Sequence, residues 1–194
     1  MNVKIVRLMG FFGVAAPVVG AIMISLSVLS TPGWSPAEDT LSALGASGFG
    51  AVVFNGGLPM TGAVMMLFST GLFELSKKAP VGQAGSAMYL AASVITAALG
   101  LATINHQPYH DYLATLLFAL IPLSMIVFSV HLWGMGLRVH AALGFIGGAI
   151  SVVSILMGGP VNGYREIAIT LALSVWQMAL GLWMYRLREP GETA

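Results

Sequence analysis

Cysteine is absent from this chain of 194 residues. The protein therefore cannot form a disulfide, use a thiol nucleophile, or hold an iron–sulfur cluster or a cysteine-ligated zinc ion. The sequence also contains no G-x-x-x-x-G-K-[ST] phosphate loop and no G-x-G-x-x-G dinucleotide fingerprint. Its basic residues form no concentrated patch, so we expect no nucleic-acid partner.

Charge is also scarce. Only 8% of the residues are charged, whereas 57% are hydrophobic, and the mean hydropathy is +0.89. Such a chain has too few polar groups to be solvated as a globular protein in water, so a lipid bilayer is its expected environment. The apolar runs contain hardly any ionisable groups, which argues against a proton pump or an ion channel.

Six apolar runs have the length of about 20 residues that a membrane-spanning helix needs. No long linker or low-complexity tract separates these runs, which indicates a single domain over residues 1–194. We therefore predict an all-α fold, a polytopic bundle of six transmembrane helices. The predicted spans are residues 8–30, 49–73, 85–104, 111–133, 141–158 and 165–186.

The basic residues predict the orientation of this bundle, because lysine and arginine are retained on the cytoplasmic side during insertion. With six spans, seven of the eight basic residues lie on the same side: Lys4, Arg7, Lys77, Lys78, Arg138, Arg186 and Arg188. Only Arg165 falls on the other side. We predict a multi-pass protein of the plasma (inner) membrane with both termini in the cytoplasm. Residues 31–48, 105–110 and 159–164 would then form the outer loops.

The first outer loop, "TPGWSPAEDTLSALGASG", is long enough to hold structure of its own. Ser35 and Glu38 have the spacing of a capping box, with a proline at the first helical position between them. This pattern predicts a short helix from Pro36 to Leu44. Asp39 and Ser42 are three residues apart, so they would share one face of that helix.

The stretch "NHQPYHDY" in the second outer loop carries two histidines and an aspartate between long apolar runs. Pro108 is best accommodated in the first turn of a helix, which predicts that the fourth span begins there. His110 and Asp111 then lie in the first turn, and His106 lies just outside it. The histidines are therefore not a preformed i, i+4 pair, and the loop would have to bring them together.

A buried amide lies close to these loops. Asn55 is about six residues from the outer end of the second span, and an amide in hydrocarbon needs partners. We predict one outward-facing binding pocket lined by Asp39, Ser42, Asn55, His106, His110 and Asp111, with Asn162, Tyr164 and Glu166 as its far wall. Four of these residues also have structural interpretations. His106 and His110 would satisfy backbone groups of the loop or contact lipid headgroups. Asn55 is typical of an interhelical hydrogen bond, and Asp111 would complement the dipole of the fourth span.

The succession "SPAEDTLSALG", then "VFNGGLPMTG", then a histidine that opens the fourth span resembles the prokaryotic membrane family catalogued as domain of unknown function 998. The resemblance covers nearly the whole chain and implies a six-span fold, without an activity or catalytic residues. A more distant similarity is to the membrane hydrolases related to alkaline ceramidase, which use serine, aspartate and three histidines around zinc. This chain offers two outer histidines, so a carboxylate would have to supply the third ligand.

Two functions fit these features. The favoured one is a non-catalytic protein that binds a lipid headgroup, a small amphiphile, a partner subunit or a second copy of itself through the outer pocket, with no cofactor. The alternative is an outward-facing hydrolase of a lipid or amide. In that case His106, His110 and Asp39 would hold zinc, with Ser42 and Asn55 as positioning groups. Without metal, Ser42 would be the nucleophile, His110 its base, and Asp39 or Asp111 the orienting group.

Overall fold

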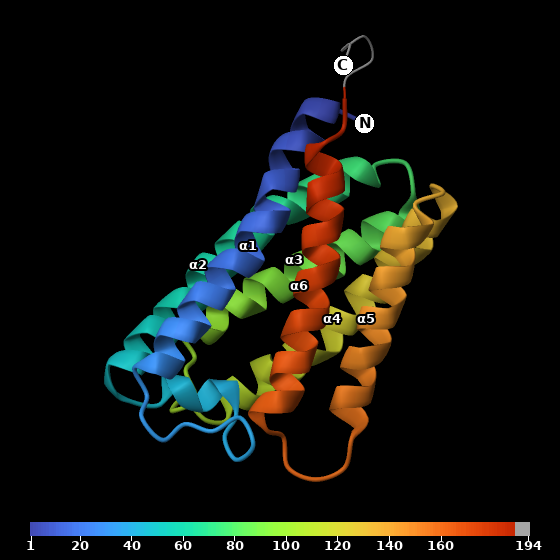
Figure 1. Ribbon diagram of the computed structural model, residues 1–194. Coiled ribbons are helices and arrows are strands. Elements are labelled where there is room, and N and C mark those ends of the chain that lie inside the picture. The colour runs from blue at the N-terminus through green and yellow to red at the C-terminus, as the bar shows by residue number, and fades with distance from the viewer. Residues whose placement is uncertain (189–194) are drawn as a thin grey trace.

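The protein folds into six long α-helices and one short 3₁₀ helix in a computed structural model that describes residues 1–188 (Figure 1). The last six residues of the predicted domain, 189–194, lie outside the described residues. No strand occurs between residues 1 and 188, so the all-α prediction is confirmed. The elements are α1 (Val3–Leu29), η1 (Leu41–Gly45), α2 (Gly48–Leu75), α3 (Pro80–Leu99), α4 (Tyr109–Gly134), α5 (Arg138–Leu156) and α6 (Gly163–Tyr185).

Five of the six α-helices are long and apolar enough to cross a membrane: α1, α2, α4, α5 and α6. The chain therefore carries the membrane helices of a multi-pass protein. Helix α3 is not in this set, because small and polar residues such as Gln83 and Ser86 dilute the hydropathy of its first half. The count of six spans remains a prediction.

The helices form a closed ring. Each α-helix packs against the next along the chain, and α6 returns to pack against α1. Both described ends of the chain lie at one end of the bundle, which we call the terminal end, together with segments 76–79 and 135–137 (Figure 1). The opposite end, here called the loop end, carries segments 30–47, 100–108 and 157–162.

Helices α1 and α6 touch backbone to backbone near the terminal end. A Cβ atom added to Gly181 would lie 2.8 Å from the carbonyl oxygen of Gly10 and 2.9 Å from the Cα of Gly13. Only glycine permits this approach, because any side chain would collide with main-chain atoms. From this contact the two helices diverge toward the loop end (Figure 1). The seam between α1 and α6 is thus tight in one half and wider in the other.

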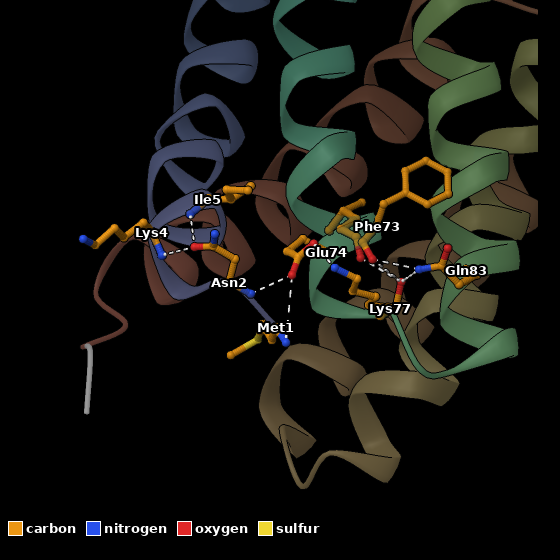
Figure 2. Close-up of polar contacts among 10 residues, drawn as sticks. Met1, Asn2, Lys4, Ile5, Phe73, Glu74, Lys77 and Gln83 are labelled. Atoms are coloured by element: carbon orange, nitrogen blue, oxygen red, sulfur yellow. Dashed lines mark hydrogen bonds and ion pairs between the residues drawn. The ribbon is translucent and has the colours of Figure 1, made fainter.

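Polar contacts fasten the start of α1 to neighbouring helices at the terminal end (Figure 2). The Glu74 carboxylate, at the end of α2, accepts a 2.6 Å hydrogen bond from the backbone N–H of Asn2 and lies 3.9 Å from the amino group of Met1. Gln83 of α3 donates to the carbonyl oxygen of Phe73 at 2.8 Å. These bonds join α1, α2 and α3 at this end.

The boundaries of the third helix differ most from prediction. The expected span was 85–104, whereas α3 covers Pro80–Leu99. Proline at a first helical position needs no hydrogen-bonded N–H and has a helical φ, so the helix starts there. At its other end, Gly100 lies against α2, where an added Cβ would be 2.4 Å from the carbonyl oxygen of Asn55. Helix α3 ends one residue before this contact.

Candidate functional site

The loop between α1 and α2 was predicted to contain one helix from Pro36 to Leu44. This prediction is wrong in its extent, because the segment forms a turn at 35–39 followed by η1 (Leu41–Gly45). The capping box predicted for Ser35 and Glu38 is not formed by these two residues. The Asp39 carboxylate, not that of Glu38, accepts the backbone N–H of Ser35, at 2.9 Å.

Hydrogen bonds to the start of α6 explain the interruption. The carbonyl oxygens of Pro36 and Asp39 accept the N–H groups of Tyr164 and Gly163, at 3.1 and 2.6 Å. In a continuous helix these carbonyls would accept N–H groups four residues further along the same segment. The N terminus of α6 has unpaired N–H groups that need such acceptors. The loop therefore serves as a cap for α6 and is held on the bundle by it.

Glu166 completes this connection from the first turn of α6. Its side chain is only 5% exposed, and its carboxylate accepts a hydrogen bond from the backbone N–H of Leu41. The N–H of Ser42 is a second backbone donor to it. Both donors belong to the first turn of η1, where N–H groups have no partner within the helix. Glu166 thus fixes η1 across the loop end of the bundle.

Arg165 is the one basic residue at the loop end, and its guanidinium is fully engaged. It is 9% exposed and donates to five backbone carbonyl oxygens at the end of α5 and in the following loop, at 2.7 to 3.2 Å. The acceptors belong to Ser154, Ile155, Met157, Gly159 and Pro160. A guanidinium has five N–H donors, so none remains for a ligand. Its positive charge also complements the dipole of α5.

His110 enters the interior from the first turn of α4. Its side chain is 5% exposed, and Nδ1 lies 2.9 Å from the carbonyl oxygen of Ala102. Because a carbonyl can only accept, Nδ1 carries the proton in this contact. In the neutral imidazole Nε2 is then an acceptor, oriented by the bond on the other nitrogen.

A cavity of about 380 Å³ lies inside the ring beneath η1. Ser42, His110 and Glu166 line its loop end, and Gln177 lines it further along α6. The other polar wall residues are serines and threonines, and those at 96, 170 and 174 donate to carbonyls of their own helices. Its remaining walls are apolar, and no lysine or arginine contributes to them. The cavity is therefore a mostly apolar space with one polar end.

The six predicted pocket residues separate into three groups. Ser42 and His110 line the cavity. Asp39 and Asn55 are used in local structure, since Asp39 bonds Ser35 and the Asn55 amide donates to the carbonyl oxygen of Gly45 at 3.0 Å.

His106 and Asp111 form the third group and are exposed, His106 on the loop between α3 and α4 and Asp111 in the first turn of α4. His106 Nδ1 lies 3.0 Å from the Thr103 hydroxyl, and Asp111 accepts from the Gln107 amide at 2.9 Å. Of the predicted far wall, Glu166 lines the cavity, Asn162 caps α6 and donates to the Ala37 carbonyl oxygen, and Tyr164 is exposed.

The proposed zinc ligands are bound to other groups. His106 contacts Thr103, His110 uses Nδ1 on a carbonyl oxygen, and Asp39 accepts a backbone N–H. Across residues 1–188, no three histidine, aspartate, glutamate or cysteine side chains come together in an arrangement that could hold a metal ion. The geometry therefore lends the metal-dependent hydrolase no ligand set.

Sequence reasoning missed Gln177, the one amide side chain of the cavity lining, as well as the serines and threonines of its walls other than Ser42. Gln177 is 1% exposed and sits in the middle of the last apolar run. The signal that singled out Asn55, an amide within hydrocarbon, applies equally to Gln177.

Comparison of the chain with curated proteins and with solved structures finds no match in either set. A family model matches residues 14–183, a stretch that includes most of α1, all of α2 to α5 and nearly all of α6. The family is described as a protein of unknown function, DUF998. The match covers most of the chain and all the residues that line the cavity. The protein therefore belongs to the DUF998 family.

Proposed function

We propose that the protein binds a single amphiphilic molecule in the cavity beneath η1. The observation that carries this proposal is the cluster of Ser42, His110 and Glu166 at one end of an otherwise apolar space. A polar head would bond this cluster, and an apolar chain would lie against the walls deeper in the bundle. The volume of about 380 Å³ is within the usual range for small-molecule sites, roughly 300–1,000 Å³.

The polar cluster favours a head group that donates hydrogen bonds. The Glu166 carboxylate offers acceptor oxygens, and Nε2 of His110 is free of the Ala102 contact that Nδ1 makes. No cation lines the cavity, and the nearby Arg165 has used its donors on carbonyls. An anionic head group would therefore be buried against a carboxylate without a counter-charge, which is costly. We expect a primary amine or an alcohol to bind and a carboxylic acid or phosphate not to bind.

The length of the cavity supports a chain-like ligand. Glu166 and Gln177 both line it and are eleven residues apart on α6, which corresponds to about 16 Å along a helix axis. Between them the α6 wall is formed by Ile167, Leu171 and Leu173 together with hydroxyl side chains bonded within the helix. Such a wall offers an alkyl chain contact without unmet hydrogen bonds.

The same proposal places all six helices across the plasma (inner) membrane, with the loop end outside and both termini in the cytoplasm. Helix α3 has 20 residues, or about 30 Å, enough to cross the hydrocarbon core. Exposed tyrosine and tryptophan residues, which favour membrane interfaces, occur at both ends of the bundle. They are Tyr109, Tyr112 and Tyr164 at the loop end and Trp133 and Tyr185 at the terminal end.

The test compares three probes of equal chain length: a long-chain primary amine, the matching alcohol and the matching carboxylic acid. Protein in lipid nanodiscs would be titrated with each, and bound probe would be counted by native mass spectrometry. We expect the amine and the alcohol to bind once per chain and the acid to bind at least tenfold more weakly, a difference of about 1.4 kcal/mol. Equal binding of all three, or of none, would contradict the proposal.

Two matched pairs of variants locate the site. Glu166→Gln retains an oxygen for the Leu41 N–H and should weaken amine binding several-fold, while Glu38→Gln changes an exposed carboxylate nearby and should have no effect. Gly20→Leu fills the cavity, since an added Cβ at Gly20 meets only Thr61, at 3.5 Å. Gly56→Leu is its control, because an added Cβ there meets nothing. Of these two glycine variants, only Gly20→Leu should lose amine binding.

A further inference from the structure

The exposed residues of the cavity lining lie together at one place on the bundle. Of all its lining residues only Ala21, Ser25 and Leu171 are exposed, and they belong to α1 and α6. These helices are in backbone contact at Gly10, Gly13 and Gly181 and diverge from there toward the loop end (Figure 1). The exposed lining residues all lie in the divergent half of the seam. The opening is therefore on the side of the ring, between α1 and α6.

The loop end above this opening is covered. Leu41 and Leu44 of η1 are buried, and they pack with Phe54 of α2 and the partly buried Ile167 of α6. The bond from Leu41 to Glu166 holds this cover on α6. A ligand entering from water would have to displace η1 and break buried hydrogen bonds. A ligand entering from the side would not.

The depth of the opening matches the hydrocarbon region. Ala21 is eight residues from the loop end of α1, and Leu171 is eight residues from the loop end of α6. Each is thus about 12 Å below the helix end. The hydrocarbon core is about 30 Å thick, so with the helices placed across the membrane this level lies among lipid acyl chains.

Resting on the proposed function, we infer that the opening between α1 and α6 is a lateral portal through which a single-chain amphiphile passes from the lipid leaflet into the cavity. Leu171 is 58% exposed and forms one side of the portal, and the small side chains of Ala21 and Ser25 form the other. The ligand is a membrane-dissolved molecule with an alkyl chain, not a water-soluble one. The head group of the ligand moves toward His110 and Glu166, and its alkyl chain packs against the apolar walls of the cavity.

Fluorescence quenching tests the portal without a bound ligand. The absence of cysteine allows one cysteine at Ser174, which lines the cavity, to carry a small bimane fluorophore. In vesicles, lipids with a nitroxide on the acyl chain and aqueous iodide would be compared as quenchers. Cysteines at exposed Val175 and at exposed Ser47 give the lipid-facing and water-facing references. We expect the labels at Ser174 and at Val175 both to be quenched by the nitroxide lipid and hardly by iodide.

A blocking substitution sharpens the test. Ala21→Trp should reduce nitroxide quenching at the Ser174 label several-fold and leave quenching at the Val175 label unchanged. Its control is Val18→Trp, an exposed position on α1 that does not line the cavity. Quenching by iodide alone, quenching by neither agent, or equal effects of the two tryptophans would overturn the portal. Because no ligand is used, these outcomes are independent of whether the amine and alcohol bind.

Discussion

The carboxylate of Glu166 accepts the backbone N–H of Leu41, a residue 125 positions earlier in the chain. This bond joins the first turn of α6 to the first turn of η1 and covers the loop end of the cavity. Since η1 has only five residues, it cannot be stable alone, and its place depends on such tertiary contacts. The same side chain is both a support for the cover and part of the polar end of the cavity.

Replacing Glu166 should separate these two roles. Glu166→Leu leaves the buried N–H of Leu41 without an acceptor and should lower the free energy of unfolding by about 1–3 kcal/mol. Glu166→Gln retains an acceptor oxygen and should cost much less. Thermal unfolding of both variants in one detergent, with Glu38→Leu as the exposed control, measures the difference. Equal losses for Gln and Leu would mean that the bond to Leu41 does not hold η1.

Arg165 allows a test of the hydrogen bonds at the end of α5. A lysine at this position keeps the positive charge but lacks the planar guanidinium with its five donors. Arg165→Lys replaces five directed donors by a single ammonium, which cannot reach the carbonyl oxygens at the end of α5 together. We expect a loss of about 1–3 kcal/mol, seen as a lower thermal midpoint. Arg186→Lys, at an exposed position at the terminal end, is the control and should change nothing. If Arg165→Lys is as stable as the native protein, the five bonds contribute little.

The sequence predicts those parts of the fold whose hydrogen bonds lie within one segment, and it does not predict those that depend on contacts between distant segments. Apolar run length predicts the six helices well, because a helix satisfies its backbone hydrogen bonds within its own segment. The segment after Ser35 has equally clear helical signals, yet its carbonyls bond Gly163 and Tyr164. No pattern within residues 31–48 contains that information. The cavity is similar: His110 and Glu166 line the same end of it only because α4 and α6 both begin at the loop end of the ring.

The glycine contact between α1 and α6 should be intolerant of any side chain. In Gly181→Ala the new methyl would lie within 3.0 Å of main-chain atoms of Gly10 and Gly13. The two helices would have to move apart, at a cost of about 1–3 kcal/mol. Gly20→Ala is the matched control, since its Cβ has an ordinary 3.5 Å contact with Thr61. Thermal unfolding should therefore distinguish the two alanine variants, and identical midpoints would refute the close packing.

Metal analysis addresses the hydrolase alternative directly. Because His106, His110 and Asp39 each bond a different protein group, protein purified without chelator should carry far less than one zinc ion per chain. His106→Ala should leave both metal content and amine binding unchanged. His110→Ala should weaken amine binding, because it removes a polar group from the cavity. One zinc ion per chain that is lost in His106→Ala would favour the metal-dependent hydrolase over the non-catalytic binding protein.

The orientation of the bundle can be tested with single cysteines, since the native chain gives no background labelling. Ser47 at the loop end and Lys78 at the terminal end are both exposed, so a cysteine at either position is accessible from its own side of the membrane. Seven basic residues lie at the terminal end, and the only one at the loop end, Arg165, is held by backbone carbonyls. The basic residues thus lie almost entirely at the terminal end, which predicts that this end faces the cytoplasm. A membrane-impermeant maleimide applied to intact cells should label Ser47→Cys at once and Lys78→Cys only after permeabilisation. The reverse pattern would put the loop end and the covered cavity on the cytoplasmic side, and the amphiphile would then come from the inner leaflet.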